Sequence, residues 1–454
     1  MRARPLKRRT PFILTVLMLA ITACVSTAAA APVSATAAGP AASGTTAAGP
    51  AVPAGFTPVA LKLAPRPAFQ PDSAQPDQTS GSDSCPAVRA GLGQYAARGI
   101  TKVGCLTITP NPARKATPPH AGASLVPAVG SWCGSQTDIW LYSRTENCIV
   151  GYSLVETVFD ANTGAQLGTA NISVNQDVVL STSSDVVKEN DSVTWVSATG
   201  RADVPGTLIY SAACTSPCAY SSFSDKVVDS FYVGKTVNAQ FQFSDSPGAT
   251  SPDLFSTFYT LATETPGVAL IKPATWSMPT KVRCDNMLAG RYPGCVFPAS
   301  VPTMYLSEAL YGPAAVNAQL GEMFLAGAPG TKTSPLTRGN PALSQGNRDA
   351  ICDSTFTPNP AEVPTDSCDE YPFAASQQSG GTLGLTGVDC LEAIPGYTNG
   401  QGTYVFVNQP TGTQRCERGH VPLAQNKAVG SQLSALYSVF RMLQGDPYTV
   451  LVTV

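Results

Sequence analysis

The sequence of 454 residues contains little charge and almost no histidine. Only 13% of its residues are Asp, Glu, Lys or Arg, and the formal net charge is −2. This balance excludes the global basic field that announces a nucleic-acid partner. The two histidines are His120, in a proline-rich stretch, and His420. We expect His420 in a loop without a role, and the alternative is a proton carrier. Neither histidine stands in a Cys and His cluster with zinc-ligand spacing, so a zinc site is not expected.

Long apolar runs are also absent, except near the N-terminus. The basic stretch "MRARPLKRR" precedes "TPFILTVLMLAITA", which is too short to span a bilayer. Residues 1–31 are therefore predicted to be a signal peptide. Two processing routes remain open: cleavage near Ala30 or Ala31, which predicts a secreted protein, or lipidation at Cys24, which predicts an anchor at the outer face of the membrane. Both routes place the mature chain outside the cytoplasm.

Cysteine, in contrast, is plentiful. Thirteen are present, and either processing route removes or lipidates Cys24, leaving twelve. An even number in an exported chain indicates disulfides. The order of the cysteines suggests that neighbours pair, although the sequence does not fix the connectivity: Cys85–Cys105, Cys133–Cys148, Cys214–Cys218, Cys284–Cys295, Cys352–Cys368 and Cys390–Cys416.

The composition changes along the chain and predicts a multidomain protein. Residues 32–127, rich in Ala, Pro, Thr and Gly, are expected to be a disordered spacer with a small helix and strand element between Cys85 and Cys105. Residues 128–270 contain seven short runs of period two separated by turn signals, which predict an all-β, sandwich-like domain. Its aromatics are typical of a core, and the alternative is a binding face for a cell-wall or glycan partner.

The last part of the chain, residues 282–454, mixes helical and strand patterns. The terminal run "GSQLSALYSVFRMLQGDPYTVLVTV" predicts a helix capped by Ser431 and stopped by Gly445 and Pro447 before a final strand. A hairpin is predicted at "YTNGQGTYVFVN".

An acidic pair, Asp369 and Glu370, lies in the stretch "SCDEYPFAAS". Pro372 restricts the preceding residue to an extended conformation, and Cys368 is a candidate disulfide anchor. Carboxylates held stiffly in this way can bind a hard cation or poise one group as a base. The alternative is a solvated turn.

A second stretch, "VPLAQNKAVGSQL", brings Asn426 and Lys427 to the start of the last helix. An amide oxygen is a competent ligand for Mg²⁺ or Mn²⁺, and a helix start with a nearby lysine suits a phosphate. By itself the asparagine is equally typical of helix capping.

Taken together, "CDEYPFA", "VPLAQNKAVGS" and a helix ending in "LQGDPY" resemble, in order and wording, the NucA/NucB-type secreted deoxyribonucleases. Upstream "VRCDN", "GCVFP" and "GNRDAICD" resemble the opening of the longer actinobacterial form. The resemblance covers roughly residues 282–454. It implies an α+β fold similar to the ββα-metal (His-Me finger-like) nucleases, a DNA substrate and a divalent metal, Mg²⁺ or Mn²⁺.

The resemblance also implies roles for individual residues. In most of that superfamily a histidine three residues before a proline is the general base, and Asp369 holds this position relative to Pro372. Glu370 would support the site or contact the metal, and Asn426 would hold the metal. The expected phosphate contacts are Lys427, Arg348 and Arg441, whose alternative role is surface charge.

Three departures keep other interpretations open. Asp369 and Asn426 are separated by an insert with Cys390 and Cys416, and position 427 holds a lysine where the family often has arginine. Residues 281–454 also carry ten Lys and Arg against thirteen Asp and Glu. A strong duplex binder usually shows a basic stripe. The alternatives to a metal-dependent endonuclease are therefore an inactive nuclease-fold surface protein whose β domain binds cell-wall polymers or glycans, and a toxin delivered to competitors.

Overall fold

The computed structural model describes residues 59–60, 72–74, 84–109, 133, 137–220 and 225–454. The predicted signal peptide, Cys24, His120 and most of the predicted spacer lie outside these residues. Residues 49–454 belong to one compact unit. Of the helices within the described ranges, none has the length and hydrophobicity needed to cross a membrane.

One small element of the chain is bounded by Cys85 and Cys105. Two short helices, α1 (Ser84–Ala90) and α2 (Leu92–Ala96), are followed by strand β3 (Lys102–Ile108). A disulfide joins Cys85 to Cys105, as the sequence suggested. Strand β3 pairs antiparallel with β5 (Glu146–Asp160), so the element is part of the large sheet of the β-rich region.

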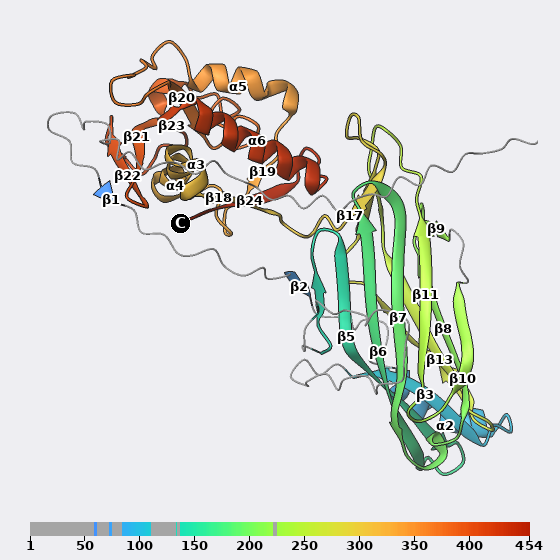
Figure 1. Cartoon of the computed structure of the whole chain (residues 1–454). Coiled ribbons are helices and arrows are strands. Elements are labelled where there is room, and N and C mark those ends of the chain that lie inside the picture. The colour runs from blue at the N-terminus through green and yellow to red at the C-terminus, as the bar shows by residue number, and fades with distance from the viewer. Residues whose placement is uncertain (1–58, 61–71, 75–83, 110–132, 134–136, 221–224) are drawn as a thin grey trace, which may run out of the picture. The chain divides into compact units, whose positions relative to one another are not determined.

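Two sheets build the β-rich region (Figure 1). The larger has the order β14-β3-β5-β6-β7-β11-β9, with β4 beside β5 and β2 beside β4. The smaller has the order β10-β8-β13-β15. The remaining strand bounds are β2 (Asp72–Ala74), β4 (Trp140–Tyr142), β6 (Gln166–Ser181), β7 (Ser184–Ala198), β8 (Gly206–Cys214), β9 (Ala219–Tyr220), β10 (Lys226–Phe231), β11 (Thr236–Ser244), β13 (Thr257–Glu264), β14 (Ala269–Lys272) and β15 (Ala274–Ser277).

The two sheets share one hydrophobic core, in which side chains of β5, β6 and β11 pack against those of β8, β13 and β15. Strands β5, β6 and β7 are 15, 16 and 15 residues long, so the expectation of short strands was wrong for these three. In β6, the polar residue Gln176 stands at an inward position and interrupts the hydrophobic alternation. Its amide donates to Tyr210 Oη at 3.0 Å and accepts from Trp276 Nε1 at 2.8 Å, which satisfies the buried group.

A third, three-stranded sheet, β12-β16-β17, follows. Its strands are β12 (Asp253–Phe255), β16 (Val282–Asp285) and β17 (Gly294–Val296), and the Cys284–Cys295 disulfide links the paired β16 and β17. Val282, both cysteines and Phe297 belong to the core of the β-rich region. The segment that the sequence grouped with the C-terminal domain from residue 282 onward thus packs with the β-rich region before the chain continues.

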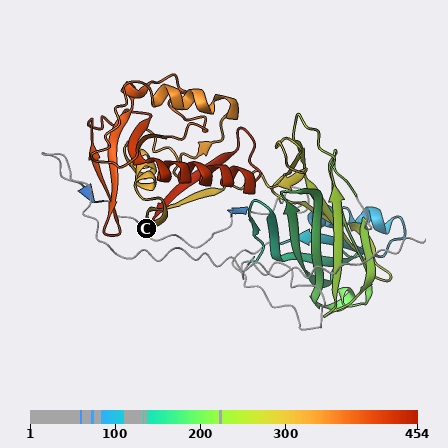
Figure 2. The same cartoon turned by 45° about the horizontal axis from the view of Figure 1, so that its top comes forward.

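The C-terminal domain has a five-stranded sheet of order β1-β22-β21-β23-β20 and a three-stranded sheet of order β18-β24-β19. Its helices and strands from about residue 300 onward are coloured yellow to red in Figure 2. Its strands are β1 (Val59–Ala60), β18 (Thr303–Ser307), β19 (Leu336–Thr337), β20 (Asp366–Tyr371), β21 (Leu391–Thr398), β22 (Gln401–Phe406), β23 (Glu417–Pro422) and β24 (Pro447–Thr453). The helices are α3 (Glu308–Tyr311), α4 (Pro313–Phe324), α5 (Ser344–Ile351) and α6 (Leu423–Val439). Apolar residues of α4 and α6 share one core with Tyr371 and Val421 of the larger sheet.

Two local predictions for this domain have different outcomes. The hairpin is confirmed: β21 and β22 are joined by Asn399 and Gly400, both with positive φ, as a two-residue turn requires. The cap at Ser431 was wrong, because α6 begins directly after Pro422. Ser431 instead lies inside the helix, where its hydroxyl donates to the carbonyl of Lys427 at 2.9 Å. All six suggested cysteine pairs are disulfides.

Candidate active site

Two paired strands and the helix that follows them bring the predicted residues together. Strand β20 pairs antiparallel with β23, so that Asp369 lies opposite Gly419 and Glu370 opposite Arg418. Strand β23 passes into α6 without an intervening loop, and Asn426 is in the first turn of that helix. The 57 positions between Asp369 and Asn426 therefore do not separate them in space, because both residues line one pocket of about 510 Å³.

Asp369 is only 6% exposed, and its surroundings favour the neutral acid. Burial raises the pKa of its carboxyl well above the usual range, and the charge of Glu370 adds to this effect. Asn317 of α4 opposes the shift by donating from Nδ2 to Asp369 Oδ2 at 3.2 Å. The same Nδ2 lies 3.2 Å from the backbone carbonyl of Asp369, which fixes the residue on its strand.

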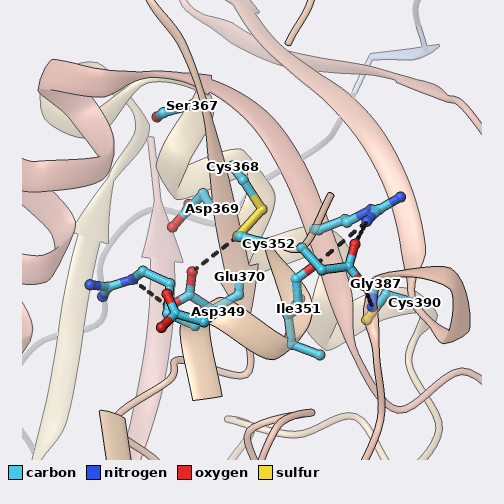
Figure 3. Close-up of a disulfide and its surroundings, with 12 residues drawn as sticks. Asp349, Ile351, Cys352, Ser367, Cys368, Asp369, Glu370, Gly387 and Cys390 are labelled. Carbon is cyan, nitrogen blue, oxygen red and sulfur yellow. Dashed lines mark hydrogen bonds and ion pairs between the residues drawn. A yellow bond between two sulfur atoms is a disulfide. The ribbon is translucent and has the colours of Figure 1, made fainter. Parts of the chain in front are cut away.

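Glu370 is held from the α5 side. Arg348 Nε lies 3.3 Å from Glu370 Oε1, and the Cys352–Cys368 disulfide joins α5 to β20 next to the pair (Figure 3). Burial raises the pKa of Glu370, while the Arg348 guanidinium acts in the opposite direction. Arg348 is half exposed and lines the pocket, so it can face both the carboxylate and an incoming anion.

Asn426 presents its amide oxygen to the pocket. Its Nδ2 donates to the backbone carbonyl of Cys368 at 2.8 Å and to Ser367 Oγ at 3.3 Å. A carbonyl is only an acceptor, so these contacts identify which end of the amide faces β20. The opposite end is the oxygen, the atom that a hard cation prefers.

The remaining predicted phosphate contacts have different positions. Lys427 is exposed on α6 and does not line the pocket. Arg441 is 1% exposed, and its guanidinium donates to Asp285 Oδ1 at 2.8 Å and to backbone carbonyls, including that of Tyr292. The structure therefore does not bring Arg441 to the site. Of the three, Arg348 alone lines the pocket.

Four residues of the site escaped the sequence analysis. Arg291 and Arg338 line the pocket, and Arg338 lies 4.9 Å above the ring of Tyr437. Asn317 contacts Asp369 from an element 52 positions upstream. Glu417 is fully buried, and neither of its carboxyl oxygens has a hydrogen-bond partner among the described residues. Burial raises the pKa of Glu417 well above the usual range, and the nearby Asp369 contributes. None of the four belongs to a quoted motif.

His420 is not the loop residue that the sequence suggested. It lies on β23 with 3% exposure, between Asp366 Oδ2 at 2.7 Å from Nδ1 and Glu392 Oε1 at 3.0 Å from Nε2. Burial alone would lower the pKa of the imidazole, but the two carboxylates outweigh it and raise the pKa to about 9. His420 does not line the pocket and serves to join β20, β21 and β23.

A family model matches the part of the chain that contains most of these residues. The family model described as Deoxyribonuclease NucA/NucB matches residues 324–451. The C-terminal domain is a NucA/NucB-type domain. Asp369, Glu370 and Asn426 lie inside the matched segment of this NucA/NucB-type domain, whereas Arg291 and Asn317 precede it.

The other comparisons add no functional argument. No curated protein matches the chain. A structure of a mutant Salmonella alpha-2-macroglobulin is 12% identical and has a TM-score of 0.19. The match covers 50% of this chain and 15% of the alpha-2-macroglobulin chain. A family 2 glycosyl hydrolase from Bacteroides cellulosilyticus is 9% identical and has a TM-score of 0.12. The match covers 41% of this chain and 29% of the hydrolase chain. The chain thus spans only a minor part of either protein.

The NucA/NucB-type domain offers oxygen ligands for a cation, but few of them. Within the described ranges no group of three or more His, Cys, Asp or Glu side chains is placed to hold a metal. The pocket instead offers the carboxylates of Asp369 and Glu370 and the amide oxygen of Asn426. This donor set fits Mg²⁺ or Mn²⁺ with most of its coordination left to water and substrate phosphate.

Proposed function

We propose that the NucA/NucB-type domain is a metal-dependent endonuclease that hydrolyses DNA phosphodiester bonds without base specificity. The observation that carries the proposal is the convergence of Asp369, Glu370 and Asn426 on one pocket inside the segment that matches a deoxyribonuclease family. The six disulfides among the described residues are compatible with an extracellular location.

Asp369 is the proposed general base. Its ionised carboxylate accepts a proton from the attacking water, and burial makes that carboxylate more basic than an exposed aspartate. Asn317 holds the carboxyl in place and favours its ionised form through the hydrogen bond to Oδ2. The position three residues before Pro372 holds this aspartate. The one histidine of the domain, His420, is hydrogen-bonded to two carboxylates outside the pocket.

Asn426 and Glu370 are the proposed metal ligands, with Asn426 oriented by the carbonyl of Cys368. A bound Mg²⁺ or Mn²⁺ would supply charge neutralisation at the scissile phosphate and the leaving oxygen. Arg348 places a second positive charge at the pocket while it pairs with Glu370. The net charge of the domain is negative, but the arginines of the pocket concentrate positive charge where a phosphate would bind.

Plasmid nicking tests the proposal. The purified mature protein should nick supercoiled DNA with Mg²⁺ or Mn²⁺ and lose this activity with a chelator. Asp369→Ala should reduce the rate by roughly 10²- to 10⁴-fold, the usual contribution of a general base. Asp349→Ala is the matched control, because it removes an exposed carboxylate from the neighbouring helix α5. Equal inactivity of wild type and Asp369→Ala with every metal would leave the inactive surface-protein interpretation.

A further inference from the structure

The β16–β17 loop, residues 286–293, contributes to the pocket although its two strands belong to the core of the β-rich region. Leu288, Ala289 and Arg291 line the pocket together with Asp369 and Asn426. Strands β16 and β17 are paired and joined by the Cys284–Cys295 disulfide. The loop therefore leaves a rigid base and reaches the candidate active site.

The position of this loop is set by a buried ionic cluster, not by loose surface contact. Arg441, which follows α6, binds Asp285 at one end of the loop and the carbonyl of Tyr292 at the other. Arg283 Nη1 lies 2.6 Å from Asp446 Oδ1, and both side chains are largely buried. Buried pairs of this kind are costly to separate, because each partner would be left as an uncompensated charge.

Arg291 itself is exposed and free of carboxylate partners within the described residues. Its guanidinium donates to Ser438 Oγ on α6, which directs it along the pocket wall. Arg338, directly after β19, and Arg348, in α5, line the same pocket. Three arginines thus line the pocket that Asp369 also lines. Arginine suits phosphate recognition because of its planar, fork-shaped donor set.

We propose that Arg291 contacts a backbone phosphate of the DNA next to the scissile one, so that the β16–β17 loop completes the substrate site of the NucA/NucB-type domain. This inference rests on the proposed function. It assigns a role in substrate binding to a residue that lies outside the family match. It also explains why the ionic cluster fixes this loop on both sides.

The test compares Arg291→Ala with Arg201→Ala in the full mature chain. Arg201 is exposed in the short helix η1 (Gly200–Ala202), so its removal is a control for the loss of one positive charge far from the pocket along the chain. Binding is measured by fluorescence anisotropy with a labelled DNA duplex and EDTA over a range of salt concentrations. Nicking is measured with Mg²⁺ to separate KM from kcat.

We expect Arg291→Ala to weaken binding roughly tenfold and to raise KM similarly, with little change in kcat. The slope of log K against log salt should fall by about 0.9, the effect of one lost phosphate contact, whereas Arg201→Ala should match wild type. Arg291→Lys should recover most of the affinity.

Three outcomes would overturn the inference. The first is that the wild-type protein nicks DNA and Arg291→Ala has the same affinity and salt slope as Arg201→Ala. This result would refute the inference and leave the proposed function intact. A change in thermal stability without a change in KM would assign Arg291 a structural role only. A wild-type protein that neither binds nor nicks DNA would end the proposed function and this inference with it.

Discussion

At the scale of single residues, the candidate site combines a proposed base that the sequence suggested with supporting residues that it did not. Asp369 follows from the family resemblance, because it lies three positions before Pro372, which is a local relation. Asn317 and Glu417 are invisible to such counting, because they reach Asp369 from α4 and β23 only after the sheet has formed. Gly419 shows how tightly they fit: a Cβ at this position would lie 2.0 Å from Asn317 Oδ1.

The hydrogen bond from Asn317 yields a prediction about pH. Because this bond lowers the pKa of Asp369, Asn317→Ala should raise that pKa further. The base works only when ionised, so the acid limb of the pH profile of kcat/KM should move to higher pH in the variant. Stability should fall by about 1–3 kcal/mol, as for other buried hydrogen bonds.

Asn347→Ala provides the control for this experiment. Asn347 is also a buried asparagine, and it donates to the carbonyl of Ala374 at 2.8 Å and to Thr382 Oγ1 at 2.9 Å without touching Asp369. Its loss should destabilise the domain and leave the acid limb in place. An unshifted limb in Asn317→Ala would argue against Asp369 as the titrating base.

At the scale of elements, the candidate site depends on how β20 is held. One edge of the strand pairs with β23, and the Cys352–Cys368 disulfide attaches α5. The sequence predicted this disulfide and the hairpin at Asn399, because both are local. It missed the start of α6, since Ser431 looks like a cap in isolation but follows a helix turn that is already formed.

Removal of the Cys352–Cys368 disulfide should affect stability and activity together. The bond closes a loop with a sequence separation of 16, for which chain entropy predicts a loss of about 3 kcal/mol. Freeing α5 also releases Arg348 from its position beside Glu370, so the double serine variant should nick DNA more slowly at a temperature where it remains folded. Thermal unfolding and nicking rates measure the two effects.

The disulfide Cys214–Cys218 offers the contrast. Its separation is 4, and it lies in the β-rich region, so its double serine variant should lose less stability and keep its nicking rate. Full activity in the Cys352 and Cys368 double serine variant would show that the disulfide does not position the site.

At the scale of the whole molecule, the sequence predicted two kinds of region but not how the chain is shared between them. The segment from Val282 to Phe297 reads as an ordinary cysteine-bounded turn, yet it contributes buried residues to the core of the β-rich region, namely Val282, Cys284, Cys295 and Phe297. Arg441 was likewise predicted to be a phosphate contact or a surface cation, and its burial against Asp285 depends on a contact between residues 156 positions apart. Local patterns contain no information about such distant partners.

The ionisable groups of the fold also act together, and they predict how stability changes with pH. Burial raises the pKa of Glu156 and Glu189 to about 7 and that of Glu322 to about 8, and carboxylates raise the pKa of His420 to about 9. At pH values between its unfolded-state and folded-state pKa, each of these groups binds more protons in the folded state than in the unfolded state. Their contribution to the free energy of unfolding is therefore complete at low pH and is lost as the pH rises. Asp446, whose pKa is lowered by Arg283 despite its burial, acts in the opposite sense and loses its contribution in acid.

Together, the contributions of these five groups place the greatest stability in mildly acidic solution, at about pH 5. They predict a decline of several degrees in Tm toward about pH 9. Calorimetry at constant ionic strength, with EDTA present, measures this curve. Glu156→Gln cannot ionise, so its Tm should fall less than that of wild type between about pH 5 and pH 7. The exposed Glu264→Gln is the matched control and should follow the wild-type curve. A Tm that stays level or increases between these pH values would show that the buried acids do not take up protons on folding.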